Sequence, residues 1–195
     1  MSGKSVATEK QQLRAGVRQH RDERSAAARH ALSSGLTREV DALTDSLEPR
    51  LIAAFLPTES EPPLIPALEA LAQGDVEVLL PLSRPDRSMD WAPHVAGTPF
   101  VVDHLGMPAP AGEIVDSTKL SELDLVLCPA ALVDREGFRL GWGLGYYDRF
   151  LAGLAHKPLV FAVVFDDEVV ASLPRENHDQ PVNGVITPTR TIWFH

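Results

Sequence analysis

The chain has 195 residues and a formal net charge of −9 at pH 7, with 44% hydrophobic and 23% charged residues. This length can bury a full hydrophobic core, and the composition is ordinary for a globular domain. The single cysteine, Cys128, excludes an internal disulfide framework. The acidic balance argues against nucleic-acid binding. No apolar run approaches the length of a membrane span, and the polar start is unlike a signal peptide, so we expect a cytoplasmic protein.

The N-terminal part of the chain is predicted to be helical. Residues from about 5 to 30 are rich in Ala, Arg, Glu and Gln and lack proline, which predicts one long surface helix. Ser33 and Ser34 are expected to cap a second helix. The apolar residues of this second helix recur at helical spacing and are Leu36, Val40, Leu43 and Leu47.

Four short apolar runs predict strands that are buried on both faces. They are RLIAAFLP (50–57), DVEVLLPL (75–82), DLVLCPAALV (124–133) and PLVFAVVF (158–165). Helical patterns connect the first pair of strands, at 62–74, and the last pair, at 145–155. Such strand–helix–strand units imply a mostly parallel sheet with helices on both faces. We therefore expect a three-layer α/β/α fold in which residues 1–195 form a single domain, with its site beyond the carboxyl ends of the strands.

Two further segments complete the chain. Residues 83–117 are rich in Pro, Gly and Asp, which predicts long loops with a short strand at FVVD (100–103). Residues 184–195 are predicted to form one final strand.

The most informative stretch is GFRLGWGLGYYDRFL, residues 137–151. Gly141, Gly143 and Gly145 stand at every second position, where the missing Cβ lets the backbone approach a ligand closely. A helix that begins just past them directs its free N–H groups and the positive end of its dipole to the same place. The spacing differs from that of a P-loop and from a G-x-G-x-x-G dinucleotide fingerprint. It indicates a phosphate cradle of another type, with a plain strand-to-helix turn as the structural alternative.

Three charged side chains flank these glycines. Arg139 and Arg149 carry planar guanidinium groups that suit phosphate oxygens. Asp148 is a hard carboxylate of the kind that holds magnesium beside phosphates.

The string RLGWGLGYYDR, residues 139–149, resembles the signature RLGxGxGYYDR of the 5-formyltetrahydrofolate cyclo-ligase (5,10-methenyltetrahydrofolate synthetase) family. The resemblance extends over nearly the whole chain. The family opens with Lys-x-x-Leu-Arg, which matches Lys10 to Arg14. The resemblance implies that these two cations contact ATP, so the helical segment 1–32 contributes to the nucleotide site. The other arginines of this segment are expected to form a solvated face and are Arg18, Arg21 and Arg24.

The family also has an aliphatic residue and a glutamate on the folate side of its pocket, and Leu56 and Glu61 occupy these positions. A carboxylate suits the N–H donors of a pterin ring. Met89 and Trp91 resemble a Met-x-aromatic step of the family, so Trp91 either stacks on the pterin or packs in the core. Asp179, in LPRENHDQPVNGVIT, falls on an acidic position that the family associates with magnesium together with Asp148.

The resemblance assigns a role to each matching position. The residues that would bind ATP are Lys10, Arg14, Arg139, Leu140, Gly141, Trp142, Gly143, Leu144, Gly145, Tyr146 and Tyr147. Those that would bind the folate are Leu56, Glu61, Trp142, Gly143, Leu144, Gly145 and Tyr146. Arg139, Arg149 and Lys10 would be catalytic, and Asp148 and Asp179 would hold Mg²⁺.

Several positions depart from the usual pattern of the family. They are Leu144, Glu168, Ala109, Asn183 and the pair Val133–Asp134. None removes a Gly, Arg or Asp of the phosphate motif, so they affect details of substrate fit more than the reaction.

The resemblance implies ATP-dependent conversion of 5-formyltetrahydrofolate to 5,10-methenyltetrahydrofolate through a phosphorylated formyl group, with ADP and phosphate released. The expected partners are these small molecules alone, without nucleic acid or membrane, and we expect a monomer. Two alternatives stay open. One is a non-catalytic relative that binds folate or nucleotide. The other is a dinucleotide-dependent oxidoreductase, in which Asp166 or Asp167 would bind the ribose.

Overall fold

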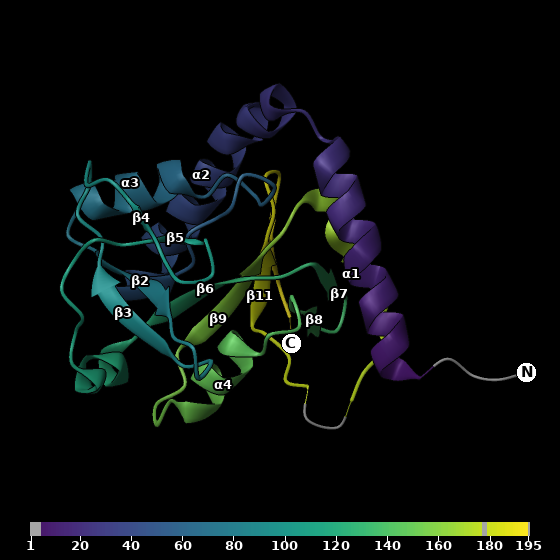
Figure 1. Ribbon diagram of the computed structural model, residues 1–195. Coiled ribbons are helices and arrows are strands. Elements are labelled where there is room, and N and C mark those ends of the chain that lie inside the picture. The colour runs from purple at the N-terminus through teal and green to yellow at the C-terminus, as the bar shows by residue number, and fades with distance from the viewer. Residues whose placement is uncertain (1–4, 177–178, 195) are drawn as a thin grey trace, which may run out of the picture.

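The computed structural model describes residues 5–176 and 179–194. Within them, a central sheet has seven strands in the order β12-β11-β9-β6-β1-β2-β3 (Figure 1). The strands are β1 (Leu51–Ala54), β2 (Glu77–Ser83), β3 (Met89–Pro93), β6 (Leu125–Pro129), β9 (Leu159–Val163), β11 (Gly184–Ile186) and β12 (Thr191–Trp193). The five inner strands are mutually parallel, and the edge strands β3 and β12 pair antiparallel to their neighbours.

Helices cover both faces of this sheet. Helices α2 (Ala26–Leu47) and α3 (Ile65–Gln73) lie on one face, and α4 (Tyr146–Gly153) lies on the other (Figure 1). Each interface holds its own hydrophobic cluster. Strand β1 is buried along its whole length because it is covered on both faces and paired on both edges. The expected three-layer α/β/α architecture with a mostly parallel sheet is confirmed.

Two smaller sheets lie beside the central one. Strands β7 (Leu132–Asp134), β8 (Arg139–Leu140) and β10 (Val169–Val170) form one of them, in the order β10-β7-β8. Strands β4 (Val101–Val102) and β5 (Pro108–Ala109) form the other. The run 124–133, expected as one strand, is therefore split between β6 and β7. The break lets the chain leave the central sheet and carry the glycine-rich loop to its edge.

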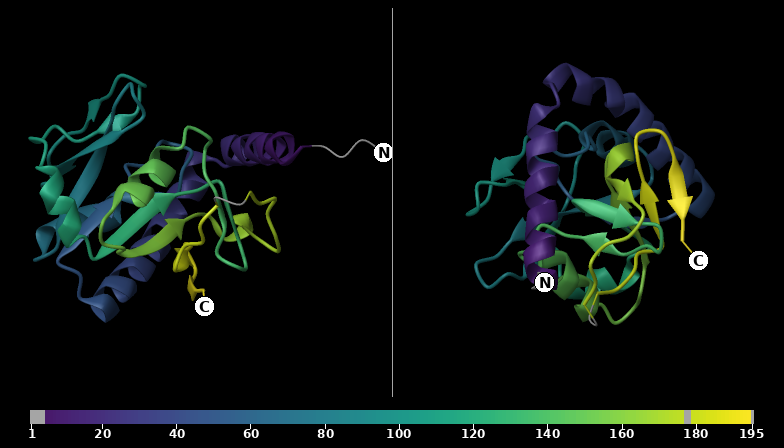
Figure 2. Two further views of the ribbon diagram at one scale, coloured as in Figure 1. Left: turned by 90° about the horizontal axis from the view of Figure 1, so that it is seen from below. Right: turned by 90° about the vertical axis from the view of Figure 1, so that its right-hand side faces the viewer.

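Helix α1 (Val6–Glu23) lies at one end of the molecule, against β7 and β8, and far from β3 (Figure 2). Its apolar face packs on a third cluster that includes Val17, Leu132 and Leu140. The expectation of one helix from 5 to 30 is wrong, because Arg24 and Ser25 take extended conformations. The Ser25 hydroxyl accepts a hydrogen bond from the Ala28 N–H and so caps α2.

Three other expectations need correction. Ser33 and Ser34 lie inside α2 and do not cap it. The final segment, expected as one strand, is a hairpin of β11 and β12, closed by the hydrogen bond from the Thr187 N–H to the Arg190 carbonyl. Strand β3 was not expected within 83–117, although the short strand at 100–103 is confirmed by β4.

Two 3₁₀ helices, η1 (Ser117–Glu122) and η2 (Asp166–Glu168), complete the elements of the described residues. No helix among the described residues is long and apolar enough to cross a membrane.

Candidate active site

A cavity of about 350 Å³ opens at the carboxyl edge of the parallel strands. The chain just after β1, the end of β2 and the end of β6 supply Leu56, Ser83 and Pro129 to its wall. The glycine-rich loop and the start of α4 form the opposite wall, from Gly141 to Asp148. The cavity therefore lies at the edge of the sheet where we expected the site.

Most of the residues predicted for the site line this cavity. They are Leu56, Glu61, Arg139, Gly141, Trp142, Gly143, Leu144, Gly145, Tyr146, Tyr147 and Asp148. The others do not line it and are Lys10, Arg14, Leu140, Arg149 and Asp179. Their contacts show how each is placed.

The glycine-rich loop requires glycine at two positions. Gly143 has φ +94° and Gly145 has φ +72°, which is left-handed backbone that disfavours a side chain. A Cβ on Gly145 would also lie 2.5 Å from Nη1 of Arg149. Gly145 is the N-cap of α4, so the first N–H groups of this helix face the cavity edge formed by the loop.

Arg149 restrains this loop. Its Nη1 donates to the carbonyl oxygens of Leu144 at 3.1 Å and Gly145 at 2.8 Å. The guanidinium thus closes the turn between the loop and α4. In this arrangement Arg149 holds the shape of the glycine-rich loop without lining the cavity, whereas its neighbours Gly145 to Asp148 line it.

Arg139 and Asp148 form an ion pair on the cavity wall, with Nη2 of Arg139 donating to Oδ1 of Asp148. The Arg139 side chain is 6% exposed and the Asp148 side chain is 68% exposed. Arg139 is therefore a fixed, nearly buried cation, whereas Asp148 presents a carboxylate to solvent and to any ligand in the cavity.

Helix α1 carries the two predicted cations, of which Arg14 contacts the loop and Lys10 contacts the segment of Glu176 and Asp179. Nε of Arg14 donates to the Gly141 carbonyl at 2.7 Å, and its guanidinium lies against Gly143. Lys10 Nζ lies 2.6 Å from Oδ2 of Asp179 and 2.9 Å from Oε2 of Glu176. Burial lowers the pKa of Lys10, but its hydrogen bonds to Asp179 and Glu176 outweigh this and raise it. Lys10 therefore stays charged at neutral pH.

The two carboxylates predicted to hold magnesium have different surroundings. Asp148 lines the cavity, whereas Asp179 binds Lys10 and closes a turn, with its Oδ2 accepting from the Glu176 N–H at 2.8 Å. Among the described residues, no group of three or more His, Cys, Asp or Glu side chains is arranged to hold a metal ion. Magnesium needs only one or two carboxylates when phosphate oxygens and water complete its shell. Asp148 fits such a site.

Leu56 and Glu61 are both buried and lie on the cavity wall facing the loop. Glu61 Oε2 accepts from the backbone N–H of Thr58 at 2.9 Å and from its hydroxyl at 3.1 Å. Oε1 lies 4.0 Å from Nη1 of Arg21. Glu61 is thus a fixed acceptor rather than a surface residue.

Trp91 does not stack on a ligand in this cavity. It is 1% exposed and lies in the core beneath α4, with its ring centroid 4.6 Å from that of Phe150. Of its motif, Met89 lines the cavity. It lies on the same face of β3 as Trp91, at the first residue of the strand, and packs against the same cluster.

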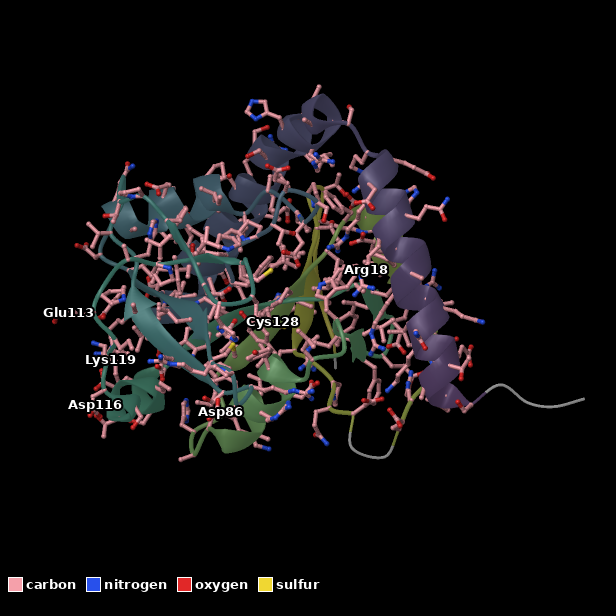
Figure 3. The ribbon with its side chains drawn as sticks, viewed as in Figure 1. Arg18, Asp86, Glu113, Asp116, Lys119 and Cys128 are labelled. Atoms are coloured by element: carbon pink, nitrogen blue, oxygen red, sulfur yellow. The ribbon has the colours of Figure 1, made fainter. Side chains whose placement is uncertain are left out.

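The expected solvated face of α1 is wrong for two of its three arginines. Arg21 is 1% exposed and donates from Nε and Nη2 to the two carboxylate oxygens of Glu168, both at 2.7 Å. Arg24 stacks on the Phe165 ring at 3.8 Å and pairs with Asp167. Arg18 is exposed, and its guanidinium lies 5.3 Å from the Trp142 ring, on the side of α1 toward the sheet (Figure 3). These contacts fix α1 to the site.

Glu168 was noted as a departure from the family's pattern, and the structure explains it. Its carboxylate accepts both guanidinium bonds of Arg21 and also the Phe165 N–H at 2.8 Å. The Glu168 carboxylate is therefore paired with the buried guanidinium of Arg21 and does not line the cavity.

The acidic residues of an oxidoreductase alternative are already engaged. Asp166 accepts hydrogen bonds from the hydroxyl groups of Thr187 and Thr189. Asp167 pairs with His20 and Arg24. Neither lines the cavity, so this structure gives the alternative no support.

Sequence reasoning missed part of the lining. The missed residues are Phe55, Pro81, Ser83, Leu105, Met107, Pro108 and Pro129. Most are apolar, and Leu105 and Met107 come from the turn between β4 and β5. For Leu105 and Met107, the available signal was the presence of apolar residues in a segment that otherwise resembles a loop. Cys128, at the centre of the molecule (Figure 3), is fully buried, and burial raises the pKa of its thiol, which leaves it a packing residue.

The comparisons with known proteins identify the family of the chain. The profile described as "5-formyltetrahydrofolate cyclo-ligase family" matches residues 6–188. The 5-formyltetrahydrofolate cyclo-ligase of Mycolicibacterium smegmatis is 35% identical over 188 residues, covering 94% of this chain and 95% of that protein.

Two solved structures share the fold. The NMR structure of Aquifex aeolicus 5,10-methenyltetrahydrofolate synthetase has a TM-score of 0.80 at 26% identity, covering 95% of this chain and 93% of that one. The Mycoplasma pneumoniae 5,10-methenyltetrahydrofolate synthetase has a TM-score of 0.71 at 20% identity, covering 92% of this chain and 99% of that one. The chain therefore belongs to the 5-formyltetrahydrofolate cyclo-ligase family.

Proposed function

We propose that the protein uses ATP to convert 5-formyltetrahydrofolate into 5,10-methenyltetrahydrofolate, with release of ADP and phosphate. Membership of the family makes it a ligase that acts on 5-formyltetrahydrofolate. The observation that supports the finer proposal is the cavity itself. One wall is a glycine-rich loop with a nearly buried arginine, and the other carries a buried glutamate among apolar side chains.

The loop wall suits the phosphates of ATP. Phosphoryl transfer needs charge neutralisation and positioning more than covalent help from the protein. In this proposal Arg139 contacts the transferred phosphoryl group, and the first N–H groups of α4 bind phosphate oxygens. Arg14 holds the loop through Gly141 and adds a second positive charge.

The chemistry begins at the formyl oxygen, which attacks the γ-phosphorus of ATP. The bond from phosphorus to the bridging oxygen breaks, and ADP leaves. The formyl carbon then carries an imidoyl phosphate, in which phosphate is a good leaving group. A neighbouring amine nitrogen of the same folate attacks this carbon and loses its proton. The carbon–oxygen bond breaks, phosphate departs and the ring closes.

The opposite wall suits the folate. Glu61 is a fixed acceptor for the N–H donors of a pterin ring. Phe55, Leu56 and Met89 provide apolar surface for the flat heterocycle. A folate held on this wall places its formyl group toward the loop, and ring closure gains its rate from that orientation.

Magnesium fits the same site. Asp148, exposed on the cavity wall, would hold the ion together with phosphate oxygens, and the ion would neutralise charge on the transferred phosphoryl group. We further propose that the protein is cytoplasmic and acts as a monomer. Sedimentation of the purified chain would test the oligomeric state.

Absorbance at the methenyl-folate band tests the proposal directly. The complete mixture of protein, 5-formyltetrahydrofolate, ATP and magnesium should show steady growth of the band. Omission of any one component should abolish it. ATP hydrolysis without methenyl formation, or binding without turnover, would instead favour a non-catalytic relative.

Lys10→Ala combined with Arg14→Ala should raise the KM for ATP much more than the KM for the folate, because both cations are assigned to the nucleotide side. The loss of two charge-assisted contacts corresponds to roughly a hundredfold or more in affinity. Initial rates with each substrate varied in turn measure this. Equal weakening for both substrates would mean that the pair orders the site as a whole, and wild-type values would return it to a structural role.

Asp148→Asn should lower activity and raise the magnesium concentration needed for half-maximal rate, because an amide coordinates the ion without offsetting its charge. Asp179→Asn is the matched comparison. Since Asp179 binds Lys10 and closes a turn, we expect it to have the weaker effect on magnesium dependence. A larger magnesium shift for Asp179→Asn would contradict this order.

A further inference from the structure

Tyr147, in the first turn of α4, carries a buried hydroxyl group that has no hydrogen-bond partner among the described residues. Its ring packs against both clusters that flank the central sheet and meets Phe150 edge-to-face, with centroids 6.4 Å apart. The ring is therefore held in place, and so is its oxygen. A buried hydroxyl left unpaired is costly, so such a group calls for a ligand or an ordered water as its partner.

The same side chain lines the cavity together with Glu61. Burial raises the pKa of Tyr147 well above its ordinary value, and the neighbouring Cys128 and Glu61 raise it further, against an opposing effect of Arg139. The hydroxyl therefore keeps its proton and is available as a donor. Glu61, fixed by both hydrogen bonds from Thr58, is available as an acceptor.

A donor and an anionic acceptor at one end of the cavity select the chemistry of the ligand there. A phosphate group is disfavoured, because the Glu61 carboxylate repels it. A neutral heterocycle that offers both N–H donors and an oxygen or nitrogen acceptor fits both groups. The surrounding wall, with Phe55, Leu56 and Pro129, is apolar and suits a flat ring.

We propose that the Tyr147 hydroxyl donates a hydrogen bond to the heterocycle of the folate while Glu61 accepts one from it, so that Tyr147 determines folate specificity and is not a nucleotide contact. This inference rests on the proposed function. It changes the role expected for Tyr147 from its position in the motif, which was ATP binding. It also gives the two adjacent tyrosines different tasks, since Tyr146 donates to the Arg84 carbonyl at 2.9 Å and ties α4 to the turn after β2.

The test is calorimetric titration of Tyr147→Phe with 5-formyltetrahydrofolate and with a non-hydrolysable ATP analogue, each alone and with the other saturating. The Kd for the folate should rise roughly three- to tenfold, as for loss of one hydrogen bond, while the Kd for the analogue stays within about twofold. The substitution removes one oxygen without a protein partner, so the midpoint of thermal unfolding should not fall.

A double-mutant cycle with Glu61→Gln adds a second readout. Tyr147→Phe should reduce the affinity for the folate by a smaller factor when Glu61 is already replaced, because the two groups form hydrogen bonds to the same ring. Tyr146→Phe is the matched comparison, and its effect should add to that of Glu61→Gln without coupling.

Unchanged folate affinity in Tyr147→Phe, or weaker binding of the ATP analogue alone, would overturn the inference. Failure of the wild-type protein to bind 5-formyltetrahydrofolate under either condition would instead overturn the proposed function, so the two failures are distinguishable.

Discussion

Replacement of Arg139 with alanine should lower turnover by roughly a hundred- to a thousandfold, the usual loss when a charged group that stabilises the transition state is removed. Arg139 is nearly buried on the cavity wall and is oriented by Asp148, so no other described side chain can take its position without rearrangement. The rate of methenyl-folate formation at saturating ATP and folate measures the effect.

Two variants of the same hairpin sharpen this prediction. Arg139→Lys keeps the charge but loses the planar fork, so its rate should lie between those of Arg139→Ala and the wild type. Arg135→Ala is the matched control, because Arg135 is exposed at the turn between β7 and β8, outside this cavity. It should retain wild-type turnover. Wild-type turnover in Arg139→Ala would remove Arg139 from the catalytic machinery.

Arg149 shows why position in a motif does not settle a mechanism. Its place in the motif predicted contact with phosphate, whereas its guanidinium binds the loop carbonyls of Leu144 and Gly145. Its role in catalysis stays a prediction, and these contacts support an indirect one, through the shape of the loop. Such a contact depends on the turn that Gly145 allows, and residue spacing alone does not reveal it.

The fold and the loop could be predicted because their signals are local. Buried parallel strands appear in the sequence as short apolar runs. Alternating glycines indicate a loop whose backbone can approach a ligand closely. The edge strand β3 was not predicted, because Pro93 and the charged residues before it are typical of a loop. The final hairpin was predicted as a single strand, because Pro188 and the threonines around it were not recognised as a turn.

The chemistry of the site was less predictable where it depends on distant partners. Arg21 and Glu168 are 147 positions apart, and the charge pattern of α1 alone suggested a solvated face. Tyr147 stands in a motif that we propose binds phosphate, but its burial and its lack of a partner among the described residues depend on the elements packed around it. Both cases involve buried charged or polar atoms whose surroundings only the folded chain defines.

The buried pair of Arg21 and Glu168 carries the largest stability prediction. Arg21→Met should lower the free energy of unfolding by about 3–5 kcal/mol, because it leaves the Glu168 carboxylate buried without its cation. Glu168 is 2% exposed, so water cannot replace the lost partner without rearrangement. Chemical denaturation followed by circular dichroism measures the loss.

Two variants separate the ion pair from mere packing. The double variant with Arg21→Met and Glu168→Met should recover most of the loss, because apolar side chains of similar length can replace a buried pair at little cost. Arg24→Met, at the C-cap of α1 three residues further on, removes a half-buried arginine from Phe165 and Asp167 and should cost only about 1 kcal/mol. If the double variant were as unstable as Arg21→Met alone, the instability would come from lost packing against Trp142 and Phe165, and the buried charge would not be its cause.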